Sequence, residues 1–162
     1  MENMVKFGPK SMTGSIWDEG GKSKILQILI SHGNNCINSI QFVYVVDKKV
    51  LRSEVHGGSN GFKFDIVTFD HSGEYLVSVS GQYSSGRLAS IAFGTNNRTY
   101  GPFGRANSSY YDDFVYNFRH KSSFGGFYGS VFNSFVYAIG VYVKPLGSLA
   151  ETETGSVKSE DD

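Results

Sequence analysis

His32 and Cys36 are the one pair in the chain whose types could supply a base and a nucleophile. A cysteine nucleophile needs its base within hydrogen-bond reach. A spacing of four residues places two side chains on one face of a helix, but on a strand end or a loop it defines no common direction. The surrounding residues carry no helix signal, so we expect no enzyme here.

Two other patterns fail the geometry that a reactive centre requires. Histidines stand at positions 32, 56, 71 and 120, without metal-ligand spacing and without a second cysteine, which disfavours a metal site. Asp112 and Asp113 are neighbours, and on an extended strand their carboxylates would point to opposite faces, so we assign them to a solvated turn. The sequence predicts neither catalysis nor a metal or other cofactor.

The elements that carry these residues follow from a threefold repeat. Gly33, Gly81 and Gly129 recur at equal intervals, and each precedes a small residue and an isoleucine in an apolar run: Ser39-Ile40, Ser90-Ile91 and Ala138-Ile139. Each copy reads as strand, loop, strand, preceded by a glycine-rich segment and another alternating stretch. Internal repeats of this length determine the fold.

Alternating apolar residues predict one buried face on each strand. The four clearest sets are Ile40, Phe42, Tyr44 and Val46; Phe62, Phe64 and Ile66; Phe114, Tyr116 and Phe118; and Ile139, Val141 and Val143. We predict an all-β fold, a β-prism of three four-stranded antiparallel sheets with pseudo-three-fold symmetry. A two-sheet sandwich also buries alternating faces, but it gives no reason for a threefold period.

Composition limits the domain count and the classes of partner. Residues 1–145 suit a single domain, whereas residues 146–162 are small, polar and acidic, which predicts a disordered acidic tail. The rest of the chain has a mild positive excess without a basic stripe, which disfavours nucleic acid. No apolar run is long enough for a membrane span. With Cys36 alone and no signal-peptide pattern at the start, we expect a cytoplasmic protein.

Several segments together resemble the jacalin-related lectins of plants. They are Trp17-Asp18-Glu19-Gly20, Ser39-Ile40-Gln41-Phe42, His56-Gly57-Gly58, Glu74-Tyr75-Leu76, the run from Thr95 to Gly104, Gly125 to Gly129, and Ala138 to Val143. The resemblance covers residues 5 to 145. It implies the β-prism and a non-enzymatic sugar-binding domain, commonly for mannose or galactose, with its primary site at one end of the prism.

The resemblance also implies how the primary site is built. A glycine-rich loop in the first repeat meets a Gly-x-x-x-Asp loop in the last repeat, whose carboxylate accepts hydrogen bonds from two sugar hydroxyls. Here the last loop falls on residues 133–137, where Asn133 replaces the glycine and Tyr137 replaces the aspartate, and only Gly14 matches in the first loop. The candidate carbohydrate-binding residues are Gly14, Asn133, Ser134, Phe135 and Tyr137, in a degenerate site.

The repeat points to a second candidate site, because Asn38 occupies the position in the first copy that Tyr137 occupies in the last. Its expected neighbour is the glycine loop of the second copy. The candidate residues are Asn34, Asn35, Asn38, Gly57, Gly58, Asn60 and Gly61, whose amides suit hydroxyl groups. Asparagine and glycine are also turn formers, which explains the same residues without a ligand.

Two functions stay open at this stage. One is a lectin-like protein for mannose-type glycans with a degenerate primary site. The other is a plant defence protein that acts through protein partners with little or no sugar binding, since the chain also resembles the family branch that restricts long-distance virus movement. Weak single sites gain from several copies acting together, so a homo-oligomer is also open.

Overall fold

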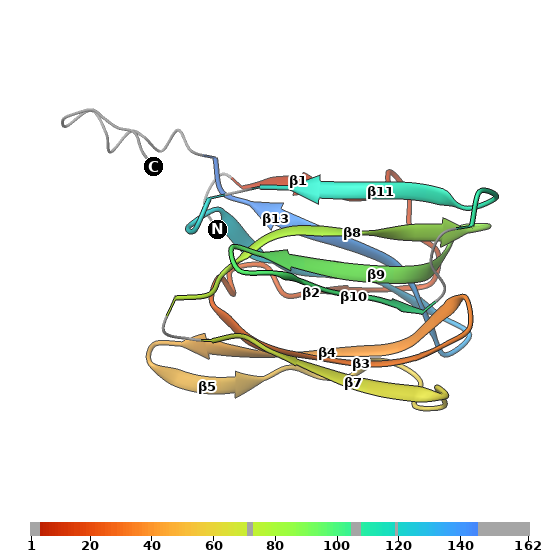
Figure 1. Cartoon of the computed structure of the whole chain (residues 1–162), viewed down its shortest axis with the longest axis horizontal. Helices are drawn as coiled ribbons and strands as arrows, with labels where there is room; N and C mark the ends of the chain where they lie inside the picture. The colour runs from red at the N-terminus through yellow and green to blue at the C-terminus, as the bar shows by residue number, and fades with distance from the viewer. Residues whose placement is uncertain (1–3, 71–72, 105–107, 119, 146–162) are drawn as a thin grey trace.

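The structure is a computed structural model that describes residues 4–70, 73–104, 108–118 and 120–145. Within these ranges the chain forms three antiparallel sheets and no helix (Figure 1). One sheet contains β1 (Val5–Phe7), β13 (Phe135–Val143), β12 (Phe124–Phe132) and β2 (Ser15–Asp18). Another contains β10 (Thr99–Gly104), β9 (Arg87–Thr95), β8 (Leu76–Ser84) and β11 (Asp112–Asn117). The third contains β5 (Lys49–Arg52), β4 (Cys36–Val46), β3 (Ile25–Gly33) and β7 (Lys63–Thr68), with β6 (His56–Gly57) also paired to β4.

The predicted all-β architecture of three sheets around one core is confirmed. Each sheet is built on a long hairpin, and the third sheet has a fifth strand because β5 and β6 pair with successive parts of β4. The first sheet joins β1 and β2 to the hairpin β12–β13, so it unites the two ends of the described chain. The predicted tail, residues 146–162, lies outside the described residues. Among the described residues, no helix has the length and apolarity that a membrane span requires.

One aromatic ring from each sheet meets at the centre. Phe42 of β4 stacks on Phe127 of β12 with ring centroids 4.3 Å apart, and Phe93 of β9 meets Phe127 edge to face at 6.3 Å. All three side chains are fully buried. Offset-stacked and edge-to-face pairs are the favoured aromatic arrangements. These contacts tie the three sheets to one interior.

The repeat is real, but the proposed equivalence of Gly33 is wrong. Gly81 pairs with Ile91 and Gly129 pairs with Ile139, whereas the residue opposite Ile40 is Ile30. Gly33 instead lies at the hairpin tip, opposite Cys36.

At Gly81 and Gly129 a Cβ has no room, because a backbone carbonyl oxygen of the hairpin partner strand and an aromatic ring of the neighbouring edge strand lie too close. A Cβ added to Gly81 would lie 2.9 Å from the Phe114 ring, and one added to Gly129 would lie 2.8 Å from the Trp17 ring. The residue opposite Ile30 on β7 is Asp65, so a side chain fits there.

The predicted burial of Phe62, Phe64 and Ile66 is also wrong. Their exposed fractions are 84, 60 and 53%. The opposite face of β7 turns inward, because Asp65 and Val67 pair with the fully buried Ile30 and Ile28.

A polar joint, formed by His32, Asp65 and the Gly104 N–H, holds the half-exposed Asp65 carboxylate on the inner side of β7. His32 Nε2 lies 2.7 Å from Asp65 Oδ2, and His32 Nδ1 accepts a hydrogen bond from the Gly104 N–H at 3.1 Å. Both ring nitrogens of a neutral imidazole are satisfied when Nε2 carries the proton. The joint fastens β7 to the neighbouring sheet and occupies the place that an aromatic ring fills in the other two copies.

Asp112 and Asp113 open strand β11, so their assignment to a turn is wrong. They pair with Tyr83 and Gln82 of β8, and Asp113 Oδ1 accepts a hydrogen bond from Gln82 Nε2 at 2.9 Å. The side-chain amide of the neighbouring strand makes the strand position favourable for this carboxylate. As neighbours on a strand, the two carboxylates do not share one face.

The fold should lose stability at alkaline pH. Burial raises the pKa of Tyr83 to about 12, and burial with the Asp18 hydrogen bond raises the pKa of Tyr142 to about 12. Burial also raises the pKa values of Tyr44 and Tyr116. The folded chain keeps these protons where the unfolded chain loses them, so the stabilisation is complete below about pH 10 and disappears towards pH 12.

Urea unfolding at a series of pH values, with tyrosinate absorbance recorded in parallel, checks this expectation. The unfolding midpoint should be level between about pH 8 and pH 10 and should fall above pH 10. Tyr83→Phe removes one of the raised groups and should flatten the fall. A midpoint that is independent of pH up to 12 would contradict the assignment.

Candidate functional site

The tips of the three long hairpins lie at one end of the prism, the right-hand end in Figure 1. The Arg87 guanidinium lies 4.8 Å from the centre of the Phe135 ring, and Arg87 Nη2 donates to the Asn35 carbonyl at 3.4 Å. Arg87 therefore connects the tips of β8–β9, β12–β13 and β3–β4. Both predicted sugar sites lie at this pole.

The structure brings together the two loops of the predicted primary site. Gly14 immediately precedes β2, where Ser15 pairs with Val131 of β12. Asn133 and Ser134 form the β12–β13 turn with φ values of 52° and 65°, positive at both positions as favoured hairpin turns require. The loop from the start of the chain thus lies against the hairpin from its end.

Tyr137 lies on the face of this hairpin next to Phe132, a residue that the sequence interpretation missed. The two rings meet edge to face with centroids 5.3 Å apart. Phe132 is also the neighbour of Gly14, since a Cβ added there would lie 2.8 Å from Phe132 Cβ. The sequence did contain a signal for Phe132, because this residue directly precedes the turn that carries the candidate residues. At the position where a carboxylate was expected, the chain therefore has the Tyr137 ring, which packs against the Phe132 ring.

Gly14 has to lack a side chain for the primary-site loops to meet. Its φ is 97°, and an added Cβ would lie 2.1 Å from the Val131 carbonyl oxygen. Gly21 is a matched control, because its φ is 90° and an added Cβ would meet nothing within 4 Å. We expect Gly14→Ala to destabilise the fold by about 1–3 kcal/mol more than Gly21→Ala, since only the former adds overpacking to the backbone strain.

Thermal unfolding of Gly14→Ala and Gly21→Ala side by side measures the difference. Equal losses would mean that the close approach of Gly14 to Val131 does not hold the two loops together.

The second predicted site is brought together only in part. The Gly58 N–H donates to the Asn38 carbonyl at 2.9 Å, so the glycine loop does lie beside Asn38. Asn38 is only 7% exposed, however, and its Oδ1 accepts a hydrogen bond from Cys36 Sγ at 3.5 Å. Asn38 therefore has structural partners and offers little surface to a ligand.

The other predicted residues of this site diverge. The Gly61 N–H donates to Ser31 Oγ at 3.1 Å, so this end of the glycine loop is fixed to β3. Asn35 Nδ2 donates to the Tyr111 hydroxyl at 3.3 Å, so its side chain is directed to the neighbouring copy. Asn34 and Asn60 are exposed. The turn-former interpretation accounts for Asn35, which has a φ of 53°.

The two candidate sites touch each other at one residue. The Gly58 N–H also lies 3.1 Å from the Ser134 carbonyl oxygen, and a Cβ added to Gly58 would lie 2.8 Å from Ser134 Cβ. A side chain at Gly58 would therefore push on the turn of the primary site as well. For that reason Gly58 variants cannot separate the two sites.

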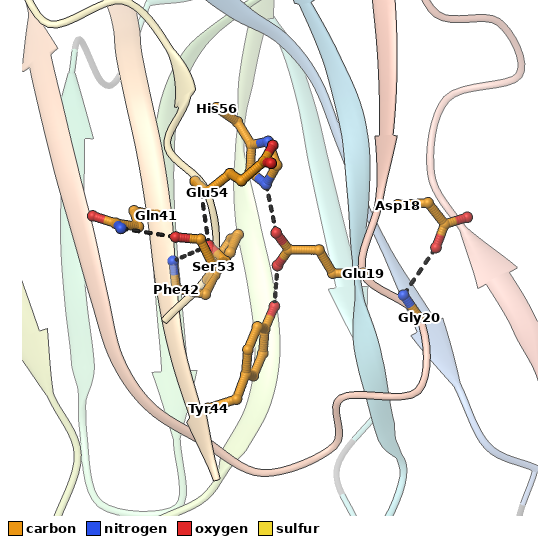
Figure 2. Close-up of polar contacts among 9 residues, drawn as sticks. All are labelled: Asp18, Glu19, Gly20, Gln41, Phe42, Tyr44, Ser53, Glu54 and His56. Carbon is orange, nitrogen blue, oxygen red and sulfur yellow. Dashed lines mark hydrogen bonds and ion pairs between the residues drawn. The ribbon is translucent and has the colours of Figure 1, made fainter. Parts of the chain in front are cut away.

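A buried carboxylate fixes the base of the glycine loop (Figure 2). Glu19 Oε2 lies 2.5 Å from His56 Nε2, and Glu19 Oε1 accepts a hydrogen bond from the Tyr44 hydroxyl at 2.5 Å. The side chains of Glu19 and His56 are 11 and 9% exposed. The His56 ring stacks on Trp17 with centroids 3.9 Å apart.

The Glu19 cluster was not predicted from the sequence. Glu19 follows β2, whereas Tyr44 and His56 belong to β4 and β6, so the cluster joins two sheets. Burial raises the pKa of the Tyr44 hydroxyl, and the adjacent Glu19 carboxylate adds to the shift. Tyr44 therefore remains a hydrogen-bond donor to Glu19. The only sequence signal was the position of Glu19 inside Trp17-Asp18-Glu19-Gly20.

Neither His32 nor Cys36 has the geometry of a nucleophile and its base. His32 is bonded to Asp65 and Gly104, and Cys36 contacts Asn38. In the part of the chain that the structure describes, no group of three or more histidine, cysteine, aspartate or glutamate side chains is placed to hold a metal. His71 lies outside that part.

Comparison with known proteins decides the family. The model of the jacalin-like lectin domain matches residues 6–142. The chain belongs to the jacalin-like lectin family. Protein RESTRICTED TEV MOVEMENT 1 of Arabidopsis thaliana is 36% identical over 97% of both chains, and Jacalin-related lectin 2 of the same plant is 35% identical over 96% of this chain and 97% of its own.

A solved jacalin-related lectin from Ananas comosus, described as mannose binding, has the same fold. It superposes with a TM-score of 0.71 at 30% identity, covering 89% of this chain and 99% of its own. Fold and family of this jacalin-like chain are those of lectins.

Proposed function

We propose that this jacalin-like protein is a cytoplasmic, non-enzymatic lectin that binds mannose-type glycans weakly through its degenerate primary site. The observation that supports the proposal is the meeting of the Gly14 loop with the β12–β13 hairpin at one pole. The Ananas comosus relative is described as mannose binding, which favours that class of sugar.

The chemistry of this pole explains why the binding is weak. A hydrogen bond to a charged group contributes about 1.5–3 kcal/mol, so the missing carboxylate removes roughly 3–6 kcal/mol. A millimolar complex has only about −4 kcal/mol in total. Tyr137 and Phe132 offer a partly exposed aromatic corner instead, which can cover the apolar face of a sugar ring.

A glycan array and isothermal titration with the full chain test this proposal. Binding to mannose-type glycans should be lost in Phe132→Ala and kept in Val115→Ala, a matched removal of an exposed apolar side chain from β11. Asn60→Ala should leave binding unchanged if the primary site is responsible, and should abolish it if the second candidate site is. Absence of any glycan signal from the folded chain would refute the proposal.

One observation favours a second candidate function, a defence role through protein partners. RESTRICTED TEV MOVEMENT 1, which resembles this chain along almost its whole length, carries a name that refers to virus movement. Tyr137 in place of the carboxylate is consistent with a scaffold that no longer depends on sugar. The alternative would be supported if the chain gave no signal on the glycan array but bound a plant protein through the hairpin pole.

A further inference from the structure

Strand β7 presents an apolar face to solvent that the corresponding strands of the other two sheets lack. Phe64 and Ile66 lie on this face and are 60 and 53% exposed, and Phe62, immediately before the strand, is 84% exposed. At the positions equivalent to Phe64 and Ile66, β11 has Asp113 and Val115, and β2 has Ile16 and Asp18. Only β7 is apolar at both positions, so this face is not a requirement of the prism.

β7 is also an outermost strand with one unpaired edge. In the described part of the chain it pairs with β3 alone. The other outer strands are short or carry features that oppose pairing: β1, β2 and β5 have three or four residues, β10 contains Pro102, and β11 begins with two aspartates. A long, apolar, unpaired edge invites addition of another strand. β7 is the edge best suited to it.

The sequence around Phe64 identifies the second strand as another copy of β7. When two β7 strands run antiparallel with Phe64 opposite Phe64, Lys63 of each copy faces Asp65 of the other and Phe62 faces Ile66. Opposite charges and aromatic pairs placed directly across a sheet are stabilising. The other long edge strand, β11, has only acids at its start and offers no such self-complementarity.

We propose that the protein forms a two-fold symmetric homodimer through antiparallel pairing of β7, with Phe64 on the symmetry axis. The three apolar side chains of each copy then form one continuous strip, and a pair of Lys63–Asp65 contacts flanks the axis. Self-complementary contacts of this kind are the property of an isologous interface. One strand pair is a small interface, so the dimer is weak and depends on concentration.

The proposed dimer has a consequence for recognition that does not depend on which ligand binds. Phe62 lies beside Gly33, at the hairpin pole, and a Cβ on Gly33 would be 3.5 Å from its ring. Antiparallel pairing of β7 therefore directs the hairpin poles of the two copies in opposite directions. The dimer would join two separate ligand-bearing surfaces, and it would not place both poles on one surface.

Sedimentation velocity of the full chain over a concentration series tests the dimer. Lys63→Glu and Asp65→Lys each place like charges across the proposed interface, and each should raise the dissociation constant about tenfold or more. A mixture of the two variants restores opposite charges at both contacts, so it should form a heterodimer with natural affinity. Ile16→Asp, on the outer strand β2, is the control and should leave the dimer unchanged.

Asp65→Lys also removes the partner of His32, so its folding is checked by circular dichroism and a cross-linking test stands beside it. In a Cys36→Ser background, Phe64→Cys should form an interchain disulfide on oxidation, because the two copies of position 64 are opposite each other. Ile66→Cys should not, because position 66 faces position 62. A chain that stays monomeric at all concentrations, or equal cross-linking of both variants, would overturn the proposal.

Discussion

Replacing Tyr137 with aspartate should raise the affinity for methyl α-mannoside about 100-fold or more. The change supplies a carboxylate at the hairpin face beside Gly14 and Phe132. Two hydrogen bonds from sugar hydroxyls to a charged acceptor contribute about 3 kcal/mol at the lower end of the usual range. That energy corresponds to about two factors of ten in the dissociation constant. Isothermal titration measures it directly.

Tyr137→Asn is the matched control, because the amide has the size of the carboxylate but no charge. It should gain far less affinity than Tyr137→Asp. If Tyr137→Asp folds normally and still fails to bind the sugar, the primary site lacks more than its carboxylate.

Replacing Glu19 with alanine should lower the free energy of unfolding by about 3–5 kcal/mol. Glu19 is the common partner of His56 and Tyr44 (Figure 2), and its removal leaves both polar groups buried without that acceptor. The loss of one member of a buried pair costs more than the pair contributes, because the desolvation of the remaining partner is no longer offset. For a chain of this length the melting temperature should fall by about 6–20 °C.

Glu54→Ala is the control for Glu19→Ala, since Glu54 is an exposed carboxylate only two residues before His56. Its effect should stay within about 0.5 kcal/mol. Urea unfolding of both variants gives the comparison. Similar losses of unfolding free energy in the two variants would show that Glu19 does not stabilise the fold through its buried contacts.

The predictions from sequence failed mostly where the burial of a residue depends on a partner far away in the sequence. The inward turn of Asp65 was not predictable from the alternation in β7, because that alternation only shows that two faces differ. The choice between the faces depends on His32 and, through it, on Gly104. The burial of Asn38 similarly follows from the Gly58 N–H, which lies in a different loop.

The sequence by itself determined the strands, the threefold repeat and the family, because a period of two residues and the recurrence of a motif are properties of the chain alone. It also located the candidate loops. Only the tertiary structure decided which face of β7 meets solvent, that Ile30 and not Gly33 matches Gly81, and that Glu19 joins two sheets. These outcomes depend on pairing and packing between residues far apart in sequence, which local sequence patterns do not determine.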